Sequence, residues 1–428
     1  MKQYHQAFEE INGYISQLAI VDTHEHLEPP AVRFGKKADL FNVFFNQYII
    51  NDLVSSGMSF ATLEQLTDEA TPLEDKWKLL RPYLAYVRNT GYYKVILRVF
   101  QDFYGIPELN DDTYTEINRK MLEENRPGLY EQVLQKRSGI TACIWDNLFA
   151  EHEFPASYIK RVFRVCDFIV LTEREKLGRF EQAYGRPLET LEAYFRFIGG
   201  QIEDAKRRGY MGLKNTIAYG RCLNFDLFDP ARTEKNYRRL YRREALTSDE
   251  ILELGNHIMH EIVKAAIAND LPMQIHTGLH AGDGNFMMNS NPAHLAGLFL
   301  KYPEARFSIL HGGYPYGGEF GTMGKSFPNV FLDMSWLHAI SPLAAQDSLD
   351  KWLDLVPVNK IFGFGGDYIS VELVYGHSKI ARENIASVLS KKVEQGDMTI
   401  SQAKSAADRI LYGNPAAFFG VEPSAQRG

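Results

Sequence analysis

The chain has 428 residues, of which 45% are hydrophobic and 24% charged, and its formal net charge is −7. This composition is typical of a globular protein and excludes a disordered, collagen-like or coiled-coil chain. The acidic balance argues against nucleic acid and membrane surfaces as partners, and three widely spaced cysteines (Cys143, Cys166, Cys222) fit neither a disulfide framework nor a cysteine zinc site.

The predicted elements begin with an amphipathic helix over residues 6–16 and a short apolar strand, Leu18–Val21. The N-terminus lacks the apolar core of a signal peptide, and no apolar run reaches the length of a membrane span, so we expect a cytoplasmic protein. Apolar runs that each end at a polar residue recur downstream, over residues 140–147, 165–171, 209–216, 271–278, 306–313, 329–335 and 360–367.

Helical patterns separate several of these strands. Thr247 and Glu250 form a capping box before a helical pattern that reaches Ala266, and residues 291–303 form another helix that ends at Pro303. Strands that alternate with helices indicate a parallel sheet. Eight such strands predict an α/β fold, a closed (β/α)8 TIM barrel.

Residues 27–140 do not follow the alternation of strands and helices. Their aromatic residues and helical periodicity predict a mostly helical insertion after the first strand. We therefore expect residues 1–428 to form a single barrel domain, with 27–140 as a cap near the mouth of the site. A second irregular region carries Arg238, Arg239, Arg242 and Arg243, which we expect to face water or another subunit of a homo-oligomer.

The ends of the predicted strands carry residues that bind metals. His24 and His26 follow the first strand and point the same way in an extended chain, although a surface turn with chance histidines is the alternative. His276, His311 and Asp367 end the fifth, sixth and eighth strands. Because the strand ends of a barrel meet at one mouth, these side chains predict a site for a divalent metal such as zinc.

Lys214 lies at the end of the fourth strand, where burying its charge is costly unless it is paired or modified. It is a metal ligand, a rim lysine or an anion-binding lysine. Arg221 is a candidate for binding a substrate carboxylate, with a surface salt bridge as the alternative. Tyr314 is a candidate pocket wall, or part of a packed turn.

These motifs, in this strand order, resemble the amidohydrolase superfamily over about residues 18–420. The segments HTGLHAGDGN, NPAHLAGLFLKYPEARFSILHGGYPYGGEF, FPNVFLDMS and FGFGGD are most similar to the amidohydrolase 2 group, including the nodulin-like domains fused to glutamine synthetase. The resemblance implies that His24, His26, Asp367 and His276 bind metal. It implies that His311 binds a second metal or polarises a carbonyl, and that Lys214, if carbamylated, bridges two metals.

The resemblance implies a cofactor of one or two divalent ions, with zinc as our choice. The metal would generate hydroxide, Asp367 would accept its proton, and the metal or His311 would stabilise the oxyanion. We therefore predict a metal-dependent hydrolase of a C–N or ester bond in a small molecule. A decarboxylase or a uronate isomerase-like enzyme on the same site is the alternative, and a non-catalytic binding protein is the third hypothesis.

Overall fold

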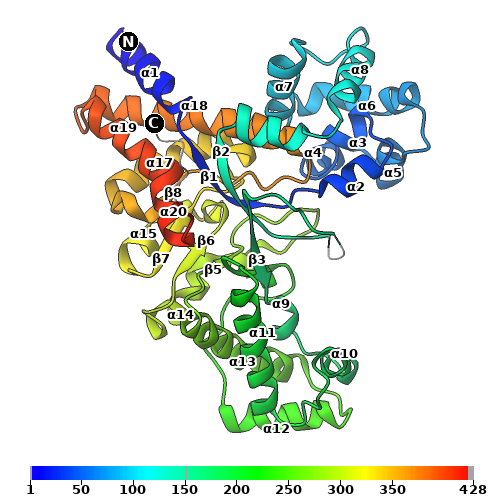
Figure 1. The fold of residues 1–428 in the computed structure, drawn as a ribbon, viewed down its shortest axis with the longest axis vertical. Coiled ribbons are helices and arrows are strands. Elements are labelled where there is room, and N and C mark those ends of the chain that lie inside the picture. Colours follow the sequence, from blue (N-terminus) through cyan, green and yellow to red (C-terminus); the bar gives the residue numbers. More distant parts are fainter. Residues whose placement is uncertain (1, 150–151, 423–428) are drawn as a thin grey trace. The chain divides into compact units, whose positions relative to one another are not determined.

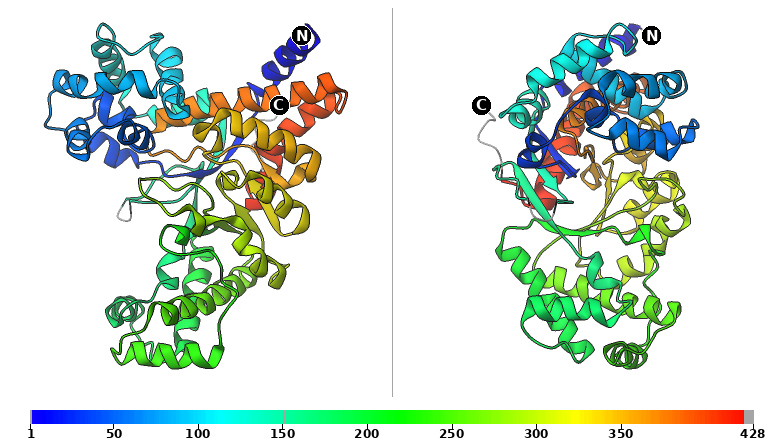
Figure 2. Two further views of the ribbon diagram at one scale, coloured as in Figure 1. Left: turned by 180° about the vertical axis from the view of Figure 1, so that it is seen from behind. Right: turned by 90° about the vertical axis from the view of Figure 1, so that its right-hand side faces the viewer.

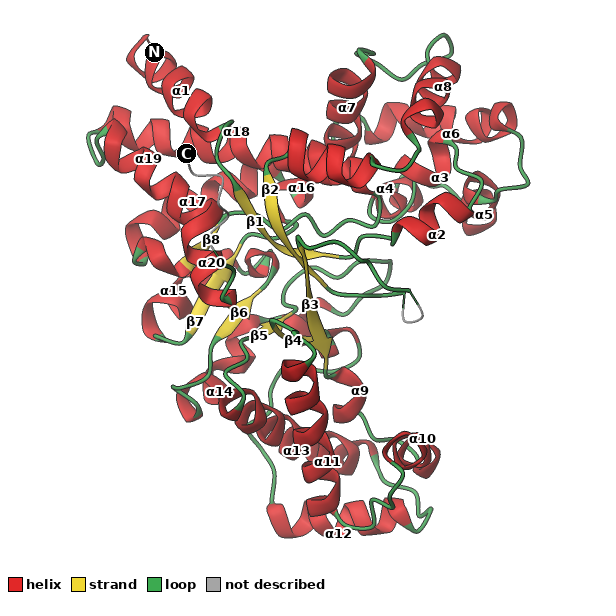
Figure 3. Cartoon of the chain, in the orientation of Figure 1, coloured by secondary structure: helices red, strands yellow, loops and turns green. Residues whose placement is uncertain are grey.

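The computed structural model describes residues 2–149 and 152–422. It has the predicted α/β architecture of a (β/α)8 barrel, in which eight strands are neighbours in chain order from β1 to β8 (Figure 3). Two compact units make up the chain. The first lies within residues 1–159, 280–285 and 333–428, and the second within residues 160–279 and 286–332.

The second unit contains the middle strands of the barrel. Consecutive strands pair in parallel, and every residue of β4, β5 and β6 is buried, as expected for strands covered on both faces. The strands are β3 (Ile159–Arg164), β4 (Gly212–Asn215), β5 (Met273–Ile275), β6 (Phe307–Ile309) and β7 (Val330–Asp333).

The predicted third strand, residues 165–171, is wrong. The strand is β3, whose Ile159 and Val162 are buried while basic residues between them are partly exposed. Val165, Phe168 and Ile169 are buried at helical spacing, and the short helix α9 (Cys166–Ile169) occupies most of the predicted run. Basic residues break the apolar pattern of β3. The first continuous apolar run in this region therefore falls mostly on the next element, α9.

Helices of the second unit follow their strands. The longest, α13, begins with the predicted capping box between Thr247 and Glu250. The helices are α10 (Arg174–Tyr184), α11 (Leu191–Arg207), α12 (Pro230–Tyr241), α13 (Ser248–Ala268), α14 (Ala296–Lys301) and α15 (Gly317–Ser326), with short 3-10 turns η2 (Ile217–Tyr219), η3 (Met287–Ser290), η4 (Pro292–Leu295) and η5 (His311–Gly313).

The first unit contains β1 (Ile20–Glu25), β2 (Ile140–Trp145) and β8 (Ile361–Phe362), and β1 pairs in parallel with β2. Helix α1 (Lys2–Ile15) packs against α18 (Figure 2). The elements after β7 are α16 (Leu337–Ile340), α17 (Pro342–Leu355), η6 (Val358–Lys360), α18 (Val371–Gln395), α19 (Ile400–Asp408), η7 (Arg409–Gly413) and α20 (Asn414–Phe419).

Between β1 and β2 the chain forms a group of helices, drawn blue to cyan in Figure 1. Helix α7 packs against α18, and the approach is close: a Cβ on Gly376 would lie 2.3 Å from the carbonyl oxygen of Val95. The helices of this group are α2 (Pro30–Gly35), α3 (Leu40–Phe44), α4 (Ile49–Ser55), α5 (Phe60–Thr67), α6 (Leu73–Val87), α7 (Gly91–Tyr104), α8 (Tyr114–Glu124) and the π-helical turn η1 (Glu131–Arg137).

Across residues 2–149 and 152–422, each helix is too short or too polar to cross a membrane.

Candidate metal centre

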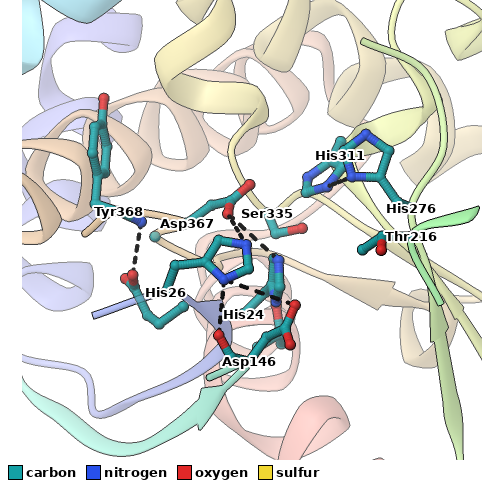
Figure 4. Close-up of polar contacts among 12 residues, drawn as sticks. His24, His26, Asp146, Thr216, His276, His311, Ser335, Asp367 and Tyr368 are labelled. Atoms are coloured by element: carbon teal, nitrogen blue, oxygen red, sulfur yellow. Dashed lines mark hydrogen bonds and ion pairs between the residues drawn. The ribbon is translucent and has the colours of Figure 1, made fainter. Parts of the chain in front are cut away.

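β1 carries two histidines to its carboxyl end. His24 and His26 alternate with Thr23 and Glu25, so both imidazoles lie on one side of the strand (Figure 4). The His24 side chain is 1% exposed and that of His26 is 14% exposed. Two neighbouring imidazoles removed from water are costly unless they bind a common partner, which argues against a chance surface turn.

Asp367 supplies that partner from the loop after β8. Its Oδ1 lies 3.4 Å from Nε2 of His24 and 3.3 Å from Nε2 of His26. A charge-assisted hydrogen bond is shorter, about 2.8 Å. Two ligands of one tetrahedral zinc ion, each about 2.1 Å from the metal, lie about 3.4 Å apart. Each of the two distances to Asp367 therefore matches a pair of ligands on one divalent ion, and nitrogen and carboxylate oxygen are ligands that zinc accepts.

Asp146 is a site residue that the sequence analysis missed. It follows β2, and its carboxylate lies with the His24 and His26 rings in a group whose ligand atoms are within 4.8 Å of one another. Nδ1 of His26 donates to the backbone carbonyl of Asp146 at 2.9 Å, which leaves Nε2 facing Asp367. Such a bond fixes the tautomer of a metal-binding histidine. The signal was present, since Asp146 lies at the polar end of the second predicted strand, residues 140–147.

Three consecutive amides after β8 bind to β1. The Gly366 amide donates to Oδ1 of Asp22 at 3.1 Å, the Asp367 amide to the His24 carbonyl at 2.9 Å, and the Tyr368 amide to Oε2 of Glu25 at 2.8 Å. Asp367, the candidate metal ligand, lies between Gly366 and Tyr368, whose amides bind side chains of β1. It adopts a φ of +61°. A non-glycine residue in this region is strained, and such strain is concentrated at functional sites.

The carboxyl groups of Asp22 and Glu25 are fully buried next to each other. Burial raises the pKa of Asp22 to about 7, despite the hydrogen bonds that it accepts. Burial and the neighbouring Asp22 raise the pKa of Glu25 well above its ordinary value. Two carboxyl groups this close share a proton, so the pair carries less negative charge beneath the histidines than two carboxylates would.

In the second unit, the structure brings His276 and His311 together. Nε2 of His276 faces the carbonyl of Leu279 at 2.9 Å, so this nitrogen carries the hydrogen. Nδ1 of His276 then accepts from Nε2 of His311 at 3.0 Å (Figure 4). The bond engages the His276 nitrogen that would bind a metal, so the ligand role of His276 stays a prediction. His311, like Asp367, has a positive φ, +67°.

The remaining predicted site residues lie on the same unit. Lys214 is fully buried in β4, and its carbonyl accepts from the Val165 amide at 3.0 Å. Tyr314 is half-buried in a turn whose backbone bonds to His311 and Leu279. Carbamylation of Lys214 and substrate binding by Tyr314 stay predictions.

The guanidinium of Arg221 donates hydrogen bonds to groups of the protein itself. Its Nη2 donates to the Asn224 carbonyl at 2.8 Å and to Oδ1 of Asn256 at 2.6 Å, and its Nε donates to the Cys222 carbonyl at 3.0 Å. Burial lowers the pKa of its guanidinium to about 10. These contacts explain the position of the guanidinium without a substrate carboxylate, and the substrate role of Arg221 stays a prediction from the sequence.

A polar cavity of about 290 Å³ lies in the first unit between the start of the helical group and the loop after β8. Amide and hydroxyl side chains make up part of its lining, and Glu28, Arg33, Lys36 and Glu69 add charges of both signs. The lining amide and hydroxyl residues are Asn42, Asn46, Gln47, Thr67 and Ser370. Such a surface suits a ligand with several hydroxyl groups better than an apolar one.

Comparisons with known proteins bear on the family and on the fold. Residues 216–421 match a family model described as Amidohydrolase. Protein fluG of Emericella nidulans is 29% identical over 312 residues, an alignment that covers 67% of this chain and 36% of fluG. The chain thus spans little more than a third of the length of that relative.

Other matches extend over nearly the whole chain. Uronate isomerase of Thermotoga petrophila is 20% identical over 447 residues, which cover 95% of each chain. The crystal structure of uronate isomerase from Thermotoga maritima has a TM-score of 0.80 at 18% identity, with 97% of each chain covered. At this identity the structural likeness establishes the fold alone.

Proposed function

The chain belongs to the amidohydrolase superfamily, and from this we propose that it is a metal-dependent isomerase of uronates or of closely related sugar acids. The observation that carries the proposal is the extent of the similarity. The alignment with uronate isomerase covers 95% of the chain, so it includes the region of α2 to α8 as well as the barrel. The family model, by contrast, matches only residues 216–421.

Isomerisation of an aldose to a ketose needs two proton transfers and no leaving group. One proton moves from C2 to C1 and another moves from the C2 hydroxyl to the C1 oxygen, while the carbonyl moves from C1 to C2, so atoms and electrons balance without a further reactant. When bound, the divalent metal supplies Lewis acidity that stabilises negative charge on the substrate oxygens. In our proposal His24, His26 and Asp367 hold the metal. Asp367 is the candidate to take up the proton from C2 and return it to C1.

The polar cavity supports a substrate with several hydroxyl groups. The amide groups of Asn42, Asn46 and Gln47 already bond within the protein, and Oδ1 of Asn46 is buried without a hydrogen-bond partner among the described residues, which makes it the candidate acceptor for a substrate hydroxyl. Arg33 is paired with Glu372 at 2.7 Å, and Lys36 is paired with Glu28. Glu69 also lines the cavity, so the formal charges of Glu28, Glu69, Arg33 and Lys36 sum to zero, as suits the hydroxyl-bearing part of a sugar acid.

Hydrolysis, our first expectation from the sequence, is the second candidate function. The family model supports it at the level of the family, and the same donors would hold a metal that activates water. Zinc as the metal and a carbamylated Lys214 belong to this candidate. Our preference for isomerisation follows from the whole-chain similarity to uronate isomerases.

A substrate panel separates the two functions. Protein loaded with Zn²⁺ or Mn²⁺ is incubated with D-glucuronate, D-galacturonate, sugar lactones and N-acyl amino acids. We expect ketose formation from a uronate and no release of acid or amine from the others. Turnover of a lactone or amide without turnover of any uronate would favour the hydrolase, and Asp367→Asn is the control that should abolish either activity.

A further inference from the structure

Gln47 joins the helical group after β1 to the loop that carries Asp367. It lies between α3 and α4 and adopts φ of +54°, a conformation that a residue with a side chain rarely takes. Its Nε2 donates to the backbone carbonyl of Asp367 at 3.1 Å, and its Oε1 accepts from the amide of Ile369 at 2.8 Å. One side-chain amide thus binds two backbone groups that lie on either side of Tyr368.

These bonds complete the restraint of Asp367. Its amide donates to the His24 carbonyl at 2.9 Å, while its carbonyl accepts from Gln47. Both backbone hydrogen-bonding groups of Asp367 are therefore fixed, one by β1 and the other by the helical group. Because the positive φ of Asp367 is strained, a backbone released on one side would relax and move its carboxylate away from His24 and His26.

We propose that Gln47 is a positioning residue for the metal centre, a role that rests on the proposed binding of metal by His24, His26 and Asp367. Gln47 does not touch the ligand atoms of these residues in the contacts described above. It acts through the main chain of Asp367, so metal affinity depends on a residue outside the barrel strands. The coupling is reciprocal: metal bound to Asp367 stabilises the segment that carries Gln47.

The same unit offers a matched control. Ser370 also ties the loop after β8 to the helical group, because its Oγ donates to the Val43 carbonyl at 2.8 Å and accepts from Nδ2 of Asn46 at 3.3 Å. This link joins the same two segments three residues beyond Asp367. Removing it should loosen the packing of the segments while leaving the backbone bonds of Asp367 in place.

The experiment compares Gln47→Met, which keeps the length of the side chain but loses both hydrogen bonds, with Ser370→Ala. Zn²⁺ affinity is measured by chelator competition, and the Tm of the apoprotein is measured in parallel. We expect Gln47→Met to weaken Zn²⁺ binding by about 10- to 100-fold, the range found for outer-shell partners of metal ligands. Ser370→Ala should bind Zn²⁺ as tightly as the unmodified protein. Its Tm should nevertheless fall by as much as that of Gln47→Met, or by more.

Equal affinities in the unmodified protein and Gln47→Met would overturn the proposal, as would equal losses in both variants. Asp367→Ala shows whether the metal site itself is correct: unchanged affinity in this variant would refute the site rather than the role of Gln47. Hydrogen exchange of the unmodified protein needs no variant. Zn²⁺ should slow exchange in residues 45–55, and unchanged exchange there with metal bound would contradict the coupling.

Discussion

Replacing Gly366 by alanine tests the packing that holds the candidate metal centre. A Cβ at this position would lie 1.7 Å from Oε1 of Glu25 and 3.2 Å from Cγ1 of Val374. Glu25 is fully buried, and its other carboxylate oxygen accepts from the Tyr368 amide, so it cannot move aside without breaking that bond. An alanine side chain is therefore disfavoured by its steric overlap with Glu25. Backbone conformation is not the reason, since Gly366 lacks the positive φ that would itself require glycine.

Two costs, one of packing and one of a lost hydrogen bond, determine how far Gly366→Ala lowers the free energy of unfolding. Inserting a methyl group into a packed interior costs about 1–3 kcal/mol. Leaving the Tyr368 amide or the Glu25 oxygen buried without its bond costs about 1–3 kcal/mol more. We therefore expect Gly366→Ala to lower the free energy of unfolding by about 2–6 kcal/mol, and to weaken metal binding because the displaced bond flanks Asp367.

Urea unfolding of the apoprotein and calorimetric Zn²⁺ titration measure both effects. Gly13→Ala is the control, since a Cβ at Gly13, inside α1, meets no atom within 4 Å. That substitution should leave stability unchanged or raise it by about 0.5–1 kcal/mol. Our reasoning is refuted if Gly366→Ala unfolds at the same urea concentration as the unmodified protein and binds Zn²⁺ equally well.

Three further predictions concern the ligands, a buried histidine pair and Arg221. Loss of an outer-shell partner typically weakens metal binding about 10- to 100-fold, and His26→Ala and Asp367→Asn should each weaken Zn²⁺ binding by more than that. Smaller losses measured by calorimetry would exclude the two residues as ligands. Burial lowers the pKa of His338 to about 4 and that of His377 to about 3. The unfolded chain binds these protons first, so the two histidines lower stability as pH drops from 6.5 toward 3, while the raised pKa values of Asp22 and Glu25 act in the opposite direction. In urea titrations the stability of His338→Gln relative to the unmodified protein should therefore rise as pH drops, and identical pH slopes would contradict this. Arg221→Met should lower Tm without changing KM, whereas a raised KM would support its predicted role in substrate binding.

The sequence was most informative where chemistry and periodicity coincide. His24 and His26 alternate along an extended strand, and Asp367 follows an apolar run, so their meeting could be predicted once a barrel was assumed. Asp146 follows the same rule and was overlooked because an aspartate after a strand is also an ordinary helix cap or turn residue. β3 was misplaced because its basic residues mask a strand that pairs correctly with β4.

Other features depend on contacts that no local pattern specifies. The contact of Gln47 with Asp367 joins residues that are 320 positions apart in the sequence. The bond between His276 and His311 depends on which nitrogen faces the Leu279 carbonyl. Likewise, the buried pair of Asp22 and Glu25 is identified by its burial rather than by its spacing. Tertiary geometry, not residue type, decides each of these cases.

The most direct test of our central claim is proton NMR of D-glucuronate incubated with the Zn²⁺-loaded protein. Isomerisation predicts loss of the anomeric C1 proton signal and growth of hydroxymethyl C1 signals from the ketose, in the unmodified protein and not in Asp367→Asn. A substrate spectrum that stays unchanged for D-glucuronate and D-galacturonate, with metal bound at His24, His26 and Asp367, would contradict the proposed isomerase.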